Sequence, residues 1–166
     1  LKEAKDKENP KLTAFRRNIH FPELLFDLGL SGHKEERFLI KVESQDQGIV
    51  YPPVITNIKG FGFFFPFPVP SDGVLCSMKI AAMLARAKGR DFYDLMFLLS
   101  QAKPDYDFLS KRCEVHNLQE FKQATAKLLR TVDLKKKQKD FEHLLFNKAN
   151  SEKILRFGEF VDSLTE

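Results

Sequence analysis

The spacing of hydrophobic and polar residues divides the chain into a strand-rich first part and a helix-rich second part. Apolar residues alternate with polar ones over residues 37–45, which is typical of a strand with one apolar face. Residues 14–21 predict another strand, and the two strands form an antiparallel ladder if they are neighbours. Between them, residues 22–30 predict a short helix or loop that ends at Gly29.

Residues 54–70 form a segment rich in phenylalanine and proline. Three prolines exclude a central strand that is hydrogen-bonded on both sides, so we expect one or two strands that end at a sheet edge. Residues 60–62 (Gly-Phe-Gly) predict a turn or bulge, because no third glycine and no helix follow them as a nucleotide-binding loop requires. The phenylalanines are candidates for a core, an interface or a base-stacking platform.

From residue 72 onward the apolar residues recur with helical spacing. Ser71 and Asp72 are good cap residues for a largely buried helix over residues 73–88, which we expect Gly89 to end. Further helices are predicted over residues 91–102, 106–113, 118–131, 134–147 and 151–164. The last three are amphipathic and predict a bundle, so the fold class is α+β. We expect a sheet domain over residues 1–70 and a helical domain over 71–166.

Composition and charge limit the classes of function. The chain has 166 residues, of which 43% are hydrophobic and 30% charged, which excludes a fully disordered polymer. No apolar run approaches the roughly 20 residues that cross a membrane. The net charge of +4 permits a polyanionic partner. Cys76 and Cys113 lack the spacing of a zinc site or a disulfide scaffold, so we expect a reducing compartment, the cytoplasm.

The candidate chemistry lies at the junction of the first two long helices. Lys79 is the only charged residue in the middle of the apolar helix, and a buried ammonium requires a carboxylate, a phosphate or a solvent cleft; the alternative is that its stem extends to water. Asp91 and Asp94 lie at the start of the next helix, where capping also explains them. Arg90 lies at the junction and can bind either acid or a ligand phosphate.

The residues from Met78 to Leu95 resemble the signature of AbiEii-type nucleotidyltransferase-like proteins, the toxins of type IV toxin–antitoxin systems. That signature has an apolar helix with one lysine, here Lys79, then a spaced arginine, here Arg86, and then an R-D-x-x-D element, here residues 90–94. The segments His20–Leu25, Gly29–Ser31 and Ile40–Glu43 are also similar to the family, so the resemblance covers roughly residues 13–103.

The resemblance implies a partial nucleotidyltransferase-type mixed sheet and Mg²⁺-assisted transfer of a nucleotidyl group from an NTP, as in polymerase-β-like enzymes. It implies that Lys79, with Arg86 or Arg90, binds the phosphates, that Asp91 and Asp94 orient the lysine or assist proton transfer, and that Glu43 is a metal ligand. The implied partners are a cognate antitoxin and an acceptor, tRNA or another RNA. No oligomeric state is implied.

One part of the family pattern is missing from the chain. The family has a Gly-Ser followed by an Asp-x-Asp pair on a strand, whereas this sequence contains no Gly-Ser dipeptide. Residues 105–107 (Asp-Tyr-Asp) match only by letters and are better explained as a turn and helix cap. We therefore expect either the C-terminal part of a longer protein or a degenerate relative without catalytic activity.

A second interpretation is a non-catalytic binding or regulatory module, in which the same lysine, arginine and aspartate residues form a structural ion-pair network. Basic residues on the predicted later helices then either contact an RNA backbone or form a solvated helix face. These residues are Lys122, Lys127, Arg130, Lys135, Lys136, Lys137 and Lys139.

Overall fold

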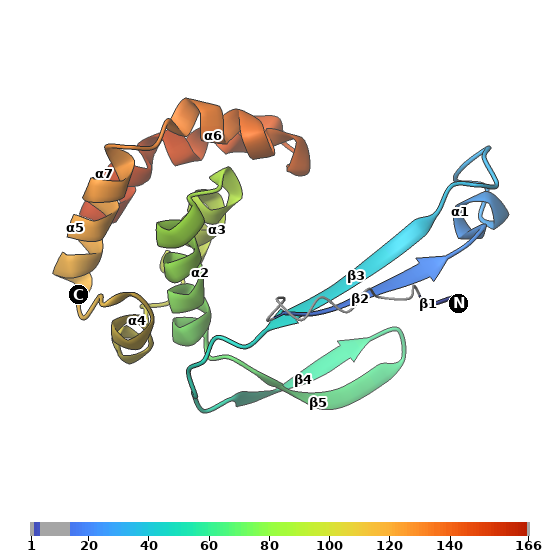
Figure 1. Ribbon diagram of the computed structural model, residues 1–166, viewed down its shortest axis with the longest axis horizontal. Helices are drawn as coiled ribbons and strands as arrows, with labels where there is room; N and C mark the ends of the chain where they lie inside the picture. The colour runs from blue at the N-terminus through green and yellow to red at the C-terminus, as the bar shows by residue number, and fades with distance from the viewer. Residues whose placement is uncertain (1, 4–13, 166) are drawn as a thin grey trace. The chain divides into compact units, whose positions relative to one another are not determined.

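The computed structural model describes residues 2–3 and 14–165 (Figure 1). The chain divides into two compact units, Leu1–Gly48 and Ile49–Glu166. Strands come first and helices follow, so the predicted α+β class is confirmed. Both sheets are antiparallel throughout the described residues.

The first unit contains a three-stranded sheet. In sheet order its strands are β1 (Lys2–Glu3), β2 (Ala14–Phe21) and β3 (Phe38–Gln45). Both predicted strands and their antiparallel pairing are therefore confirmed, with Ile19 opposite Ile40 in the register. The short helix α1 (Leu24–Asp27) follows β2, and Gly29 has a φ of 68° directly after it, as expected for a helix end.

The two faces of the β2–β3 ladder differ in polarity. Residues directly opposite each other share a face, so the pairs Ile19–Ile40 and Phe21–Phe38 lie together on an apolar face. This face is not covered: Phe38 is 40% exposed and Ile40 is 42% exposed. The other face carries the polar pair Arg16–Glu43.

The second unit begins with a hairpin of β4 (Val54–Gly60) and β5 (Phe63–Val69). The two residues between the strands, Phe61 and Gly62, have φ angles of 47° and 83°, as a type I′ turn requires. Of the predicted alternatives, the structure therefore has the turn and not the bulge, and two strands and not one.

The register of the hairpin explains how it accommodates prolines. Gly60 and Phe63 flank the two-residue turn and form the first hydrogen-bonded pair, so every second pair after them is hydrogen-bonded. Pro66 and Pro68 fall on the intervening pairs. Their missing N–H groups therefore point away from β4, and the ladder loses no hydrogen bond.

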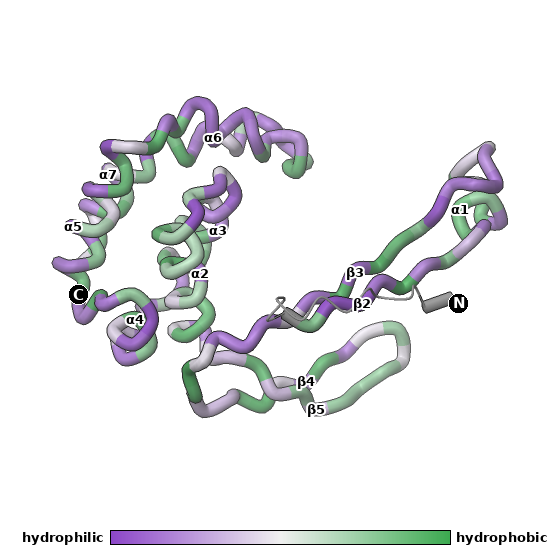
Figure 2. Tube along the Cα trace, in the orientation of Figure 1, coloured by the Kyte–Doolittle hydropathy of each residue, from purple (hydrophilic) through white to green (hydrophobic). Residues whose placement is uncertain are grey.

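The hairpin carries several exposed large apolar residues, and Figure 2 shows the hydrophobic stretches along β4 and β5. Phe61 is 104% exposed, Phe63 72% and Phe67 50%. The phenylalanines are thus surface residues in this unit, and the interpretation that they form its core is wrong.

The helices form the rest of the second unit. In chain order they are α2 (Asp72–Arg86), α3 (Gly89–Leu99), α4 (Tyr106–Cys113), α5 (Leu118–Leu129), α6 (Leu134–Phe141), the 3₁₀ segments η1 (Glu142–Leu144) and η2 (Lys148–Arg156), and α7 (Phe157–Asp162). The predicted helix α4 is confirmed at both ends, and α7 packs on α5 and η2. Within the described residues no helix is long and apolar enough to cross a membrane.

Two predicted helices are wrong in their bounds. Helix α6 ends at Phe141 rather than at residue 147, and a 3₁₀ turn follows it. The segment after Asn147 is 3₁₀ as far as Arg156 before it becomes α-helical. The 3₁₀ pitch brings Ser151 and Ile154 to the buried side together.

The junction of α2 and α3 also differs from the prediction. Ala87, with a φ of 46°, ends α2, whereas Gly89 is the first residue of α3. A Cβ atom at Gly89 would lie 2.0 Å from the carbonyl oxygen of Lys137 and 2.6 Å from Cδ1 of Phe141. Gly89 is therefore needed for the close packing of α3 on α6, not for ending a helix.

The hydrophobic core lies among the helices. At its centre the rings of Phe92 and Phe157 meet edge to face with their centroids 5.0 Å apart. The almost fully buried members are Cys76, Ile80, Met83, Phe92, Leu95, Leu109, Phe121, Phe141, Ile154, Phe157 and Val161. This core fixes the α2–α3 hairpin on which the candidate site lies.

Candidate active site

The predicted site residues lie on the two facing helices α2 and α3. Ser71 begins α2 as expected, its hydroxyl accepting the N–H of Val74 at 3.3 Å. Lys79 and Arg86 are seven residues apart and therefore lie on one side of α2. Because the chain reverses at Ala87, the start of α3 lies beside the end of α2.

Lys79 pairs with Asp94. Its Nζ lies 2.9 Å from Oδ2 of the carboxylate. The lysine side chain is 26% exposed and the aspartate 42% exposed, so the pair lies at the margin of the core and is open to solvent. The lysine thus meets a carboxylate, which is one of the environments expected from its position on an apolar helix.

Arg86 and Asp91 form a bidentate pair. Nε of the arginine lies 2.9 Å from Oδ2, and Nη2 lies 2.7 Å from Oδ1. The carboxylate is 0% exposed, whereas the guanidinium side chain is 43% exposed. The backbone N–H of Lys88 also donates to Oδ2, at 3.3 Å, so Asp91 caps α3 as expected.

The pKa values of this pair reflect the burial of Asp91 and its contact with the more exposed Arg86. Burial raises the pKa of Asp91, but the hydrogen bonds and charge of Arg86 outweigh it, so the pKa lies below the ordinary value of 3.8. The bond to Asp91 likewise raises the pKa of Arg86. The charges of Lys79 and Asp94 also act on this pair, so the four side chains form one electrostatic network.

Arg90 belongs to a pocket next to this network. The pocket has a volume of about 460 Å³ and lies between the α2–α3 junction and α6. Its lining consists of Arg86, Lys88, Gly89, Arg90, Lys137, Asp140, Phe141 and Leu144. The sequence indicated Arg86 and Arg90 as phosphate contacts. It did not predict that Lys88 and Lys137 line the same pocket as these two arginines.

Glu43 lies in the first unit, on β3. Its Oε1 lies 2.5 Å from Nε of Arg16 and 3.0 Å from Nζ of Lys41. The hydrogen bond from Lys41, with a contribution from Arg16, lowers the pKa of Glu43. In the described part of the chain no three histidine, cysteine or acidic residues are grouped so that they could hold a metal ion.

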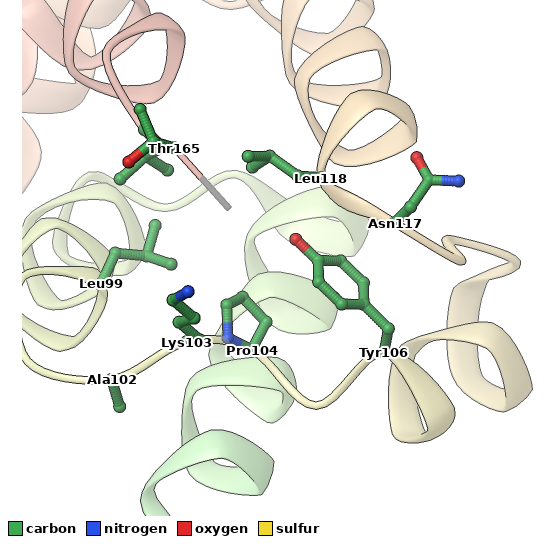
Figure 3. A pocket seen from close by; sticks show the side chains of 9 residues that line it. Leu99, Ala102, Lys103, Pro104, Tyr106, Asn117, Leu118 and Thr165 are labelled. Atoms are coloured by element: carbon green, nitrogen blue, oxygen red, sulfur yellow. The ribbon is translucent and has the colours of Figure 1, made fainter.

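A second pocket of the helical unit holds none of the predicted site residues (Figure 3). It has a volume of about 300 Å³, and Leu99, Tyr106 and Leu118, at the ends of α3, α4 and α5, surround it. Nearby, Asp105 accepts the N–H of Phe108 at 2.9 Å and so caps α4. The cap predicted for the Asp-Tyr-Asp segment is confirmed.

Comparison with known protein families adds the decisive observation. The family described as "Nucleotidyl transferase AbiEii toxin, Type IV TA system" matches residues 2–161. The chain belongs to this family. No curated protein and no solved structure matches the sequence significantly.

Membership of the AbiEii family confirms the resemblance carried by residues 78–95. It implies a nucleotidyltransferase-like toxin of a type IV toxin–antitoxin system, and therefore an antitoxin partner. The family match is longer than the segment of roughly residues 13–103 that resembles the family by sequence. It also includes the helices that line the pocket of Arg90.

Proposed function

We propose that this AbiEii-family chain binds the phosphates of an NTP through Lys79 and Arg86 during nucleotidyl transfer to an acceptor, a tRNA or another RNA. The observation that supports this most is the pairing of each cation on α2 with one acid on α3. Two cations held in fixed positions about two helical turns apart on one side of α2 are suited to a polyphosphate.

The hydrogen-bond inventory of the two cations leaves donors for such a ligand. The Lys79 ammonium has three N–H groups, and one of them is used by Asp94. The Arg86 guanidinium has five, and Asp91 engages its Nε and Nη2. The remaining donors bind phosphate oxygens and stabilise the charge that develops on the leaving pyrophosphate when the acceptor oxygen attacks.

The two acids then have different roles. Asp91 is fully buried and already holds Arg86, so it is a positioning residue that keeps the guanidinium plane fixed. Asp94 is partly exposed and holds Lys79, and its second oxygen is open to accept a proton or a ligand hydroxyl. Arg90 supplies a further cation from the neighbouring pocket.

The family implies a divalent metal, and we keep Glu43 as a proposed ligand for Mg²⁺. The described residues do not fit a complete metal site: the Glu43 carboxylate is held by Arg16 and Lys41, and no group of three metal-binding side chains surrounds it. We therefore assign no step of the reaction to the metal.

We further propose a domain boundary near residue 70, with a sheet domain over residues 1–70 and a helical domain over residues 71–166. The change from β5 to α2 between Val69 and Asp72 supports it. We place the protein in the cytoplasm, because Cys76 and Cys113 are free thiols, and the cognate antitoxin is its partner there.

The test is a transfer assay with a separate binding readout. The chain is incubated with labelled NTPs, Mg²⁺ and total RNA, and NTP binding is measured by equilibrium dialysis. Lys79→Ala and Asp94→Ala are compared with Lys111→Ala, which removes an exposed lysine from α4. We expect Lys79→Ala to lose NTP binding at least tenfold, while Lys111→Ala binds like the wild type.

The rival function is a non-catalytic module, and the structural role of Asp91, a fully buried acid that caps α3, favours it. The same assay distinguishes the enzyme from the non-catalytic module. If the wild type and both site variants transfer label equally and bind NTP equally, the charged residues are only a structural ion-pair network. Far-UV circular dichroism on every variant checks that the helices remain folded.

A further inference from the structure

Several cations without an ion pair in the described part of the chain gather in the pocket between α3 and α6. Arg86 is neutralised by Asp91 and Lys79 by Asp94. By contrast, the pocket residues Lys88, Arg90 and Lys137 make no ion pair with another residue in the described ranges. The single acid in the lining is Asp140, so cations exceed acids there.

The geometry of the pocket is fixed by backbone packing. The carbonyl oxygen of Lys137 lies only 2.0 Å from the position that a Cβ of residue 89 would take, so only glycine allows α3 and α6 to approach this closely. Phe141 is 3% exposed and anchors the end of α6 on the same side. Lys137 is therefore held beside the α2–α3 junction by the core itself and not by a flexible loop.

The positive charge continues along α6 outside the pocket. Lys135, Lys136 and Lys139 lie on this helix, and all three are exposed. The eight residues of α6 span about 12 Å, which is longer than a single phosphate group. Such a strip suits the repeated phosphates of a polynucleotide.

Not every basic residue of the predicted stretch takes part. Lys122 donates its Nζ to the carbonyl oxygens of Asp162 and Leu164, at 2.8 Å and 2.9 Å, so it closes the end of α7. The exposed lysines of α6 lie on the helix that also contributes Lys137 to the pocket, so they extend its positive charge.

We propose that the pocket formed by Lys88, Arg90 and Lys137, with the exposed lysines of α6, binds the phosphate backbone of an RNA. The inference extends the proposed function, because it gives the RNA acceptor a binding surface separate from the Lys79–Asp94 pair. The pocket binds one phosphate between Arg90 and Lys137, and the exposed lysines of α6 bind the phosphates that follow it along the RNA.

The test measures RNA and NTP binding by the same variants. Lys88→Gln/Lys137→Gln removes two lysines from the pocket. The matched control, Lys103→Gln/Lys111→Gln, removes two exposed lysines, one just before α4 and one on it, and α4 lies apart from α6 in Figure 1. Fluorescence anisotropy with a labelled mixed-sequence single-stranded RNA is recorded over a series of salt concentrations, and equilibrium dialysis measures binding of ATP, GTP, CTP and UTP.

We expect the pocket variant to lose RNA affinity about tenfold or more, and the slope of log K against log salt to fall by about 1.4, since single strands contribute about 0.7 per lost phosphate contact. The control should change RNA affinity less than about threefold, and NTP binding should stay unchanged in both variants. Equal losses in the pocket variant and the control, no RNA binding by the wild type, or loss of NTP binding by the pocket variant would each overturn the inference. Failure of the proposed function has a separate signature, which is unchanged NTP binding in Lys79→Ala.

Discussion

The pair between Arg86 and Asp91 predicts unequal costs for removing its two members. Asp91 is 0% exposed and Arg86 is 43% exposed, so only the arginine can turn to water when its partner is lost. We therefore expect Arg86→Ala, which leaves a buried carboxylate without a cation, to destabilise the helical unit more than Asp91→Asn does.

The magnitudes follow from this asymmetry. Removing one partner of a buried ion pair costs about 3–5 kcal/mol, and we expect about 3 for Arg86→Ala because solvent already screens the guanidinium. Asp91→Asn loses charge-assisted hydrogen bonds but leaves no buried charge, which costs about 1–2 kcal/mol. The double variant Arg86→Ala/Asp91→Asn should be more stable than Arg86→Ala, since the buried charge is then gone.

Urea unfolding followed by far-UV circular dichroism measures these differences, because every helix except α1 lies in the second unit. The pH dependence gives a second check. In the wild type the pKa of Asp91 is lowered, so its contribution to stability is present above pH 3.8 and is lost as the pH falls through the folded-state pKa. Without Arg86 the main influence that lowers this pKa is lost while burial still raises it, so the deficit of Arg86→Ala should shrink on acidification. A cost below about 1 kcal/mol at neutral pH, or a larger cost for Asp91→Asn, would refute the reasoning.

Three further outcomes follow from the described contacts. Lys79→Met should change the free energy of unfolding by less than about 1 kcal/mol, because the pair with Asp94 is solvent-exposed; a larger loss in urea titration would contradict this. Gly89→Ala should destabilise by about 3 kcal/mol through its clash with α6, whereas Gly32→Ala, at an open position, should stay within about 0.5; equal melting curves for both would count against the packing argument. Burial raises the pKa of the Cys76 thiol to about 12, so a thiol-specific reagent should label Cys76 only after denaturation, as mass spectrometry can verify.

The elements that the sequence predicts well are those fixed by local signals. The period-two alternation of residues 37–45 gave β3, and the cap residue Asp105 gave the start of α4. The α2–α3 junction was mispredicted because the left-handed conformation falls on Ala87, and alanine rarely adopts it. Gly89 is instead required by its close contact with α6. Such a contact is not encoded in neighbouring residues.

The candidate site shows the same limit. The cost of burying a lysine is a local argument, and a carboxylate, the group that Lys79 meets, was one of several environments that it allowed. Which acid pairs with which cation depends on the alignment of two helices, so the separate partners of Lys79 and Arg86 could not be read from spacing. Lys137 comes from a helix distant in sequence, and tertiary packing alone brings it to Arg90.

The prolines of the β4–β5 hairpin have a consequence for self-association. On the outer side of β5, Pro66 and Pro68 offer no donor to an incoming strand, whereas β4 presents the N–H groups of Ile55 and Asn57 outward. On that side of β5 only the N–H of Phe64 remains, so an added strand finds more donors at β4. Two copies that pair through their β4 edges would leave only the donor-poor edges of β5 exposed, which disfavours growth into a fibre.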